Sequence, residues 1–168
     1  LKDVYVSKVV YFREDKIVYF HLTSKSIISY DILDTLKEEL KLKLSYFKDI
    51  KIKISYTGLD RKENKDIIKM YWMNIVYIFK TLCPSIAGWY KQIEYLCIED
   101  NLKIKLPKGL FYDRLMKLNI AYVLKSRLNE ELGIDLNITM EKAIDEFKKS
   151  KIMKKDEKIS TKTVADIC

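Results

Sequence analysis

DILDTLKEELKLKLSYFKDIKIKISY, residues 31–56, changes its hydrophobic period halfway along. Up to Phe47 apolar residues recur every three or four positions, which is the period of an amphipathic helix. Ser29 can cap this helix, and Asp31 carries a negative charge in its first turn, where the helix dipole favours one. From Ile50 onward apolar residues alternate with lysine and serine, as in a strand with one buried face. A helix followed by a strand predicts an α+β fold.

The preceding residues predict a β-hairpin. Residues 4–11 and 17–23 are both rich in β-branched and aromatic side chains, and the polar segment REDK at 13–16 joins them over a hairpin-like length. Together with the helix and strand that follow, they predict a first domain of ββαβ order over residues 1–58. A charged segment without apolar periodicity follows, and we expect a linker over residues 59–66.

The remaining chain predicts a second domain over residues 67–141. A helical stripe runs from Ile68 to Phe79 and ends before Pro84, with Trp72 expected in the core. A short helix is expected over residues 86–93. A strand at 102–106, a long helix ending at Gly133 and a strand at 134–140 complete an ααβαβ order. Residues 142–168 contain few apolar side chains and predict a charged helix extension followed by a flexible tail.

The composition limits the class of protein. Lysine and arginine exceed aspartate and glutamate by 32 to 24, which gives a net charge of +8 that favours polyanionic partners or simply a solvated surface. The longest apolar stretch, residues 70–79, is too short to cross a membrane. The three cysteines show no metal-binding or disulfide spacing, and the first residues lack the pattern of a signal peptide. We therefore expect a cytoplasmic protein without a membrane partner.

Catalytic motifs are missing from the sequence. The single histidine, His21, has no nucleophile motif near it, and neighbouring acids such as Glu38 and Glu39 diverge on a helix instead of converging. No phosphate-binding glycine loop and no paired metal-binding carboxylates occur. We expect no enzymatic activity, no cofactor and no metal site.

Two sets of residues are candidates for binding. Aromatic side chains outside a small core often anchor protein partners, and the segment after Pro84 offers three of them: Trp89, Tyr90 and Tyr95. Basic residues interleaved with apolar ones at KIKIS (51–55) and KIKLPK (103–108) could instead hold nucleic acid. The basic candidates are Lys103, Lys105, Lys108 and Arg114. Affinity for nucleic acid would fall steeply with salt, whereas an aromatic anchor would lose little.

Several motifs resemble a known family in order and spacing. The first domain resembles the first N-terminal domain of PolC-type bacterial DNA polymerase III alpha subunits, through KVVYFREDKIVYFHL (8–22), IISYDILDTLKEEL (27–40) and KIKISY (51–56). The second domain resembles that family's second N-terminal domain, through Tyr71 and Trp72, CPSI (83–86), DNLKIKLPKGLFYDRL (100–115) and ELGIDLNI (131–138). The second domain is also similar to the first domain of the initiator DnaA and the last domain of the clamp-loader tau subunit, which share a KH-like fold.

The resemblance implies a role in DNA replication. A chain of this family would be a non-catalytic part of a DNA-directed DNA polymerase that also carries a 3'-5' exonuclease. Its expected partners are replisome proteins, namely the clamp loader, the helicase or other polymerase components. The alternative is a basic module with weak affinity for single-stranded DNA.

Overall fold

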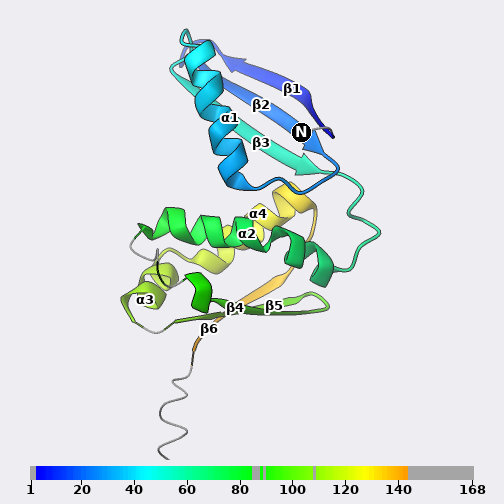
Figure 1. Cartoon of the computed structure of the whole chain (residues 1–168), viewed down its shortest axis with the longest axis vertical. Coiled ribbons are helices and arrows are strands. Elements are labelled where there is room, and N and C mark those ends of the chain that lie inside the picture. The colour runs from blue at the N-terminus through cyan, green and yellow to red at the C-terminus, as the bar shows by residue number, and fades with distance from the viewer. Residues whose placement is uncertain (1–2, 85–87, 89, 108, 144–168) are drawn as a thin grey trace, which may run out of the picture.

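The computed structural model describes residues 3–84, 88, 90–107 and 109–143, which form two three-stranded sheets with helices between and beside them (Figure 1). The α+β class is therefore confirmed. Among the described residues, no helix has the length and apolar character needed to cross a membrane.

The first sheet has the expected ββαβ order. β1 (Val4–Phe12) and β2 (Ile17–Ser24) form an antiparallel hairpin, and α1 (Tyr30–Lys43) connects β2 to β3 (Asp49–Tyr56), which pairs parallel to β2. The strand order is β1-β2-β3. A bulge at Ser7 shifts the β1 register, and the Ser7 hydroxyl donates a hydrogen bond to the His21 carbonyl at 3.0 Å.

The second sheet repeats this strand pattern. Its order is β4-β5-β6, with an antiparallel hairpin followed by a parallel third strand. The elements of this unit are α2 (Asn64–Leu82), a 3₁₀ turn η2 (Tyr90–Gln92), β4 (Glu94–Ile98), β5 (Asn101–Leu106), α3 (Leu110–Lys117), α4 (Ile120–Leu132) and β6 (Asn137–Lys142).

The structure corrects the predicted ααβαβ order in three places. β4 was not predicted, because its apolar residues 95–98 are consecutive and do not alternate with polar ones, and the strand depends on its pairing with β5. The long helix is divided, because Asn119 adopts a left-handed conformation (φ 49°) between α3 and α4. Of the predicted short helix, Tyr90–Gln92 form the 3₁₀ turn, while residues 85–87 and 89 lie outside the described residues. Gly133 ends α4 at φ 70°, as expected.

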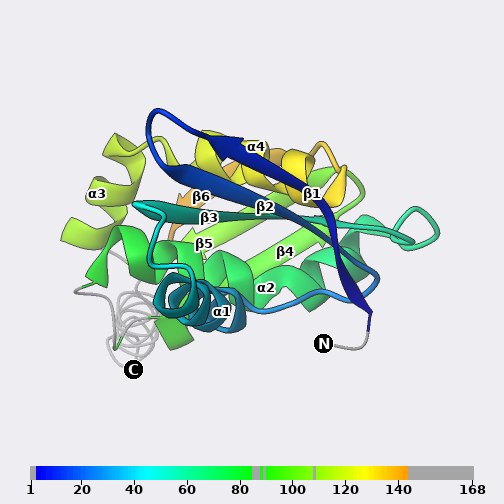
Figure 2. The ribbon, with the colours of Figure 1, turned by 90° about the horizontal axis from the view of Figure 1, so that it is seen from above.

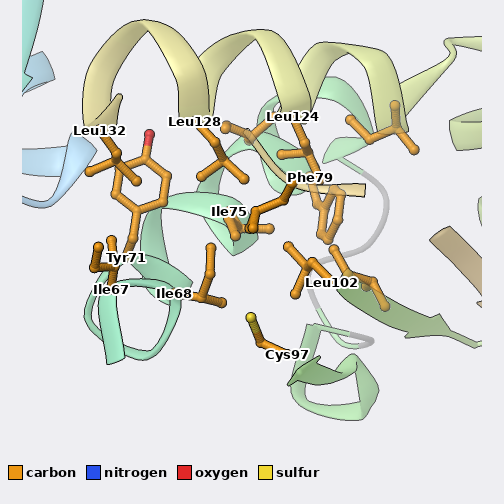
Figure 3. Packing of buried hydrophobic residues seen from close by; sticks show 14 of the residues in the cluster. Ile67, Ile68, Tyr71, Ile75, Phe79, Cys97, Leu102, Leu124, Leu128 and Leu132 are labelled. Atoms are coloured by element: carbon orange, nitrogen blue, oxygen red, sulfur yellow. The ribbon is translucent and has the colours of Figure 1, made fainter. Parts of the chain in front are cut away.

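The two units share a core. α2 and α4 lie between the two sheets (Figure 1), and their apolar side chains point toward each other (Figure 3). One cluster of buried residues runs through all of these layers and includes Leu22, Ile54, Ile68, Ile75, Phe79, Leu102, Ile104, Leu124 and Leu128. Of the expected linker at 59–66, residues 59–63 form an irregular segment with Leu59 buried in this core, and residues 64–66 form the first turn of α2. The expected tail at 144–168 lies outside the described residues.

Trp72 is not the core residue of its helix. Tyr71 is fully buried, whereas Trp72 is only half-buried and packs against the margin of the core. α2 is covered both by the first unit and by the second sheet, so its buried stripe is wide enough to include Ile67 and Tyr71. Trp72 consequently lies at one side of that stripe, above β4.

Candidate functional site

The aromatic candidates are held against α2. The Tyr95 ring, on β4, stacks on Trp72 with centroids 4.1 Å apart and an interplanar angle of 29°. The Lys80 ammonium lies 4.0 Å from the centroid of the Tyr90 ring. Both tyrosines are half-buried, and Trp89 lies outside the described residues. Tyr90 and Tyr95 are therefore fixed in place and keep part of their surface accessible.

The edge strand β4 presents further apolar surface. Leu96 and Ile98 point to the outer face of the second sheet and are 53% and 59% exposed. In the part of the chain that the structure describes, no strand pairs with the outer edge of β4. A groove of about 500 Å³ lies at the end of this strand, lined by Glu63, Asn64, Lys65, Cys97, Ile98 and Glu99. We call Trp72, Tyr95, Leu96 and Ile98 the β4 edge surface.

Two basic candidates of the second sheet lie close to acids. Lys103 and Lys105 project from the outer face of β5, where the Lys103 ammonium lies 2.9 Å from the Glu141 carboxylate and the Lys105 ammonium lies 4.0 Å from that of Glu94. Arg114 is exposed on α3, away from that face, and Lys108 lies outside the described residues. Among the described candidates, the structure thus does not gather Lys103, Lys105 and Arg114 into one positive surface.

A second basic and aromatic surface lies on the first sheet. The strand registers place Lys8, His21 and Lys53 in one row of the sheet and Val10, Tyr19 and Lys51 in the next. The ammonium groups of Lys51 and Lys53 lie 5.5 and 5.8 Å from the centroid of the Tyr19 ring. The Phe12 ring meets that of Tyr19 edge to face at 5.4 Å. We call these residues the open face of the first sheet.

Only part of this open face could be predicted from the sequence. The alternating KIKIS segment indicated that Lys51 and Lys53 share one face of a strand, opposite the buried Ile50 and Ile54. Their meeting with Tyr19 depends on the parallel pairing of β2 and β3, which is set by the α1 connection and cannot be read from either strand alone. In Figure 2, which shows the molecule from above, β1 and β2 cross in front of α4, and α1 lies beside the sheet.

A buried polar network connects the two units. The Tyr30 and Tyr71 hydroxyls each donate to the Glu131 carboxylate at 2.7 Å, and the Arg127 guanidinium donates to it at 3.2 Å. The Asn74 amide nitrogen donates to the Ile28 carbonyl at 2.9 Å. Burial, and then the Glu131 charge, raise the pKa of Tyr71 far above its usual value. Each polar group has a partner, which is the arrangement of a structural network and not of a reactive centre.

No metal-binding group stands out in the described ranges. Nowhere among residues 3–84, 88, 90–107 and 109–143 do three His, Cys, Asp or Glu side chains converge on one point. Cys83 and Cys97 are both buried, and burial raises the pKa of each thiol, which disfavours the thiolate needed for nucleophilic attack.

Comparison with known proteins gives two family matches. The family model described as DNA polymerase III polC-type N-terminus II matches residues 70–167, and the one described as DNA polymerase III polC-type N-terminus I matches residues 1–54. No curated protein was found to match the sequence. Along the chain, the N-terminus I match precedes the N-terminus II match.

Proposed function

Since the chain belongs to the polC-type DNA polymerase III N-terminal family, we propose that it is a non-catalytic docking region that positions a replicative DNA polymerase in the replisome. In this proposal the polymerase and 3'-5' exonuclease activities belong to other parts of the parent protein, which acts in the cytoplasm. The second unit acts as a KH-like protein-binding module. Its partners are replisome proteins, namely the clamp loader, the helicase or another polymerase component.

The β4 edge surface carries this proposal. Leu96 and Ile98 are adjacent on the outer face of one edge strand, while Trp72 and Tyr95 are stacked on its other side. Aromatic and aliphatic side chains that are already fixed lose little conformational entropy when a partner covers them. The unpaired backbone edge of β4 can in addition accept an extended segment of the partner as a further strand.

Charge supports a protein partner at this surface. Lys103 and Lys105 beside it are paired with Glu141 and Glu94, so the second sheet offers little excess positive charge to a phosphate backbone. The exposed part of the surface is apolar instead. Apolar anchors of this kind give contacts that depend weakly on salt.

The experiment is a binding titration of the chain against purified clamp loader and purified helicase from the same organism, at two salt concentrations. The double variant Leu96→Lys/Ile98→Lys should weaken the interaction by about tenfold or more, because two buried charges would replace two apolar contacts. Both positions are exposed in the free chain, so the thermal midpoint should change little.

Leu42→Lys is the matched control, because Leu42 is 83% exposed on α1 and lies outside the β4 edge surface. It should leave the affinity unchanged. If none of these replisome proteins binds at micromolar concentrations, or if the control weakens binding as much as the double variant, the docking role at β4 is wrong.

A further inference from the structure

We propose that the open face of the first sheet binds single-stranded DNA, separately from any protein that docks at β4. The face combines three features that such a ligand requires: positive charges on neighbouring positions, an aromatic ring close to them, and an adjoining groove. None of these residues belongs to the β4 edge surface.

The charges are arranged along the strands. Lys51 and Lys53 are two residues apart on β3, so their side chains leave the sheet on the same side about 6.6 Å from each other. Lys8 lies across the sheet in the row of Lys53, with His21 between them. The three lysines therefore lie on the two outer strands, β1 and β3, and can neutralise successive phosphates of a strand that crosses the sheet.

These positive charges are available. Within the described part of the chain, no carboxylate lies at ion-pair distance from Lys8, Lys51 or Lys53, in contrast to the paired lysines of the second sheet. All three lysines are exposed. β3 and β5 thus have similar sequences, KIKIS and KIKL, but among the described residues only the lysines of β5 have acidic partners.

The aromatic ring is placed for stacking. Tyr19 is half-buried in the central strand β2, and the ammonium groups of Lys51 and Lys53 lie near its ring, 5.5 and 5.8 Å from the ring centroid. Phe12 meets it at the end of the hairpin and is 49% exposed. Stacking on an aromatic side chain is worth about 1–3 kcal/mol per base, whereas duplex DNA keeps its bases stacked inside and gains nothing from Tyr19.

A groove beside this face matches an extended ligand. It has a volume of about 640 Å³, with Tyr19, His21, Lys51 and Lys53 on the sheet side and Arg127, Glu130 and Glu131 on the α4 side. Many of its lining residues are polar or charged. Glu130 stands on the wall opposite the lysines, so a strand bound there would place its phosphates toward β3 and away from α4.

The test measures fluorescence anisotropy of a labelled oligothymidylate of roughly 12 nucleotides, titrated with the whole chain between about 50 and 200 mM salt. Lys51→Gln/Lys53→Gln should weaken binding about tenfold at the lower salt. It should also reduce the slope of log affinity against log salt by about 1.4, since each single-strand phosphate contact contributes about 0.7. Tyr19→Ala should weaken binding fivefold or more and leave the salt slope unchanged. Tyr19→Phe keeps an aromatic ring and should bind as tightly as the parent chain.

Lys103→Gln/Lys105→Gln is the matched control, since it removes the same charge from the other sheet, and it should bind within twofold of the parent chain. The proposal fails if this control loses as much affinity as the Lys51 and Lys53 variant, or if no binding is seen at the lower salt. It also fails if duplex DNA or oligouridylate binds as tightly as the DNA single strand. Equal displacement by polyglutamate would show that the face recognises charge alone, as for an acidic protein segment.

Discussion

Glu131 is the residue at which the two units meet through polar contacts. Its carboxylate is 7% exposed and accepts hydrogen bonds from Tyr30 of the first unit and Tyr71 of the second. A buried carboxylate is costly unless it is paired and hydrogen-bonded, and here the Arg127 guanidinium completes the set. Because these bonds are directional, the network favours one arrangement of α1 against α2 and α4.

The tyrosines of this region make stability depend on alkaline pH. Burial raises the pKa of Tyr56 to about 12, and burial together with the Glu131 charge raises the pKa of Tyr30 and Tyr71 above their usual value of 10.0. A pKa that is higher in the folded state gives stability that is complete below pH 10 and is lost as the pH rises further. We therefore expect the free energy of unfolding to decline above pH 10.

Urea unfolding at pH 9, 10 and 11 measures this decline, to which each such tyrosine contributes up to about 1.4 kcal/mol per pH unit. Tyr71→Phe should have a smaller decline between pH 10 and 11 than the parent chain, although it is less stable at pH 9. Tyr122→Phe, at a position 69% exposed, should follow the parent chain. Identical declines in all three proteins would contradict a role for the buried hydroxyl.

At the scale of elements, the sequence indicated the regular ones well. The 14 residues of α1 and the alternation in β3 and β5 show the periods of 3.6 and 2 that burial imposes, and the structure has all three elements. α1 ends at Lys43 instead of Phe47, and the Ser29 side chain, although at the N-cap position, makes no capping hydrogen bond. The features that were not predicted depend on contacts between strands. β4 depends on pairing with β5, and the open face depends on the β2–β3 pairing, so neither is contained in a local pattern.

The break between α3 and α4 is a local miss of another kind. Leu115, Leu118, Leu128 and Leu132 keep a helical spacing across it, so periodicity alone predicts one helix. Asn119 ends that helix, because asparagine tolerates the left-handed conformation (φ 49°) better than most residues. The first helical turn of α4 then begins at Ile120, which is fully buried.

Two substitutions at Asn119 test whether this break is required. Asn119→Gly should leave the free energy of unfolding within about 0.5 kcal/mol, since glycine adopts positive φ without strain. Asn119→Val should lower it by about 1–2 kcal/mol, because a β-branched residue is strained in this conformation. Both proteins are compared by urea unfolding at neutral pH. If the valine variant is as stable as the parent chain, α3 and α4 can merge into one helix without loss.

The whole molecule is built from two sheets of the same strand pattern around a common layer of helices (Figure 1). α2 belongs in sequence to the second unit, yet Asn74 and Tyr71 bind the first one. The hydrophobic cluster likewise runs from Leu22 and Ile54 of the first sheet to Leu102 and Ile104 of the second. Small domains bury too little surface to be very stable alone, and a shared core offsets this.

A shared core predicts that the two units unfold together, and the distribution of tryptophan allows a direct test. Both tryptophans, Trp72 and Trp89, belong in sequence to the second unit, and Trp72 stacks on Tyr95 of β4, so tryptophan fluorescence follows the second unit. Ile54→Ala removes a buried side chain of the first sheet and should cost about 2–5 kcal/mol. In a cooperative molecule, this loss lowers the urea midpoint seen by tryptophan fluorescence as much as the midpoint seen by circular dichroism.

Val9→Ala, at an exposed position of β1, is the control and should move neither midpoint appreciably. If Ile54→Ala leaves the fluorescence transition in place while circular dichroism shows an earlier loss of structure, the first unit unfolds on its own and the contacts at Glu131 do not couple the two.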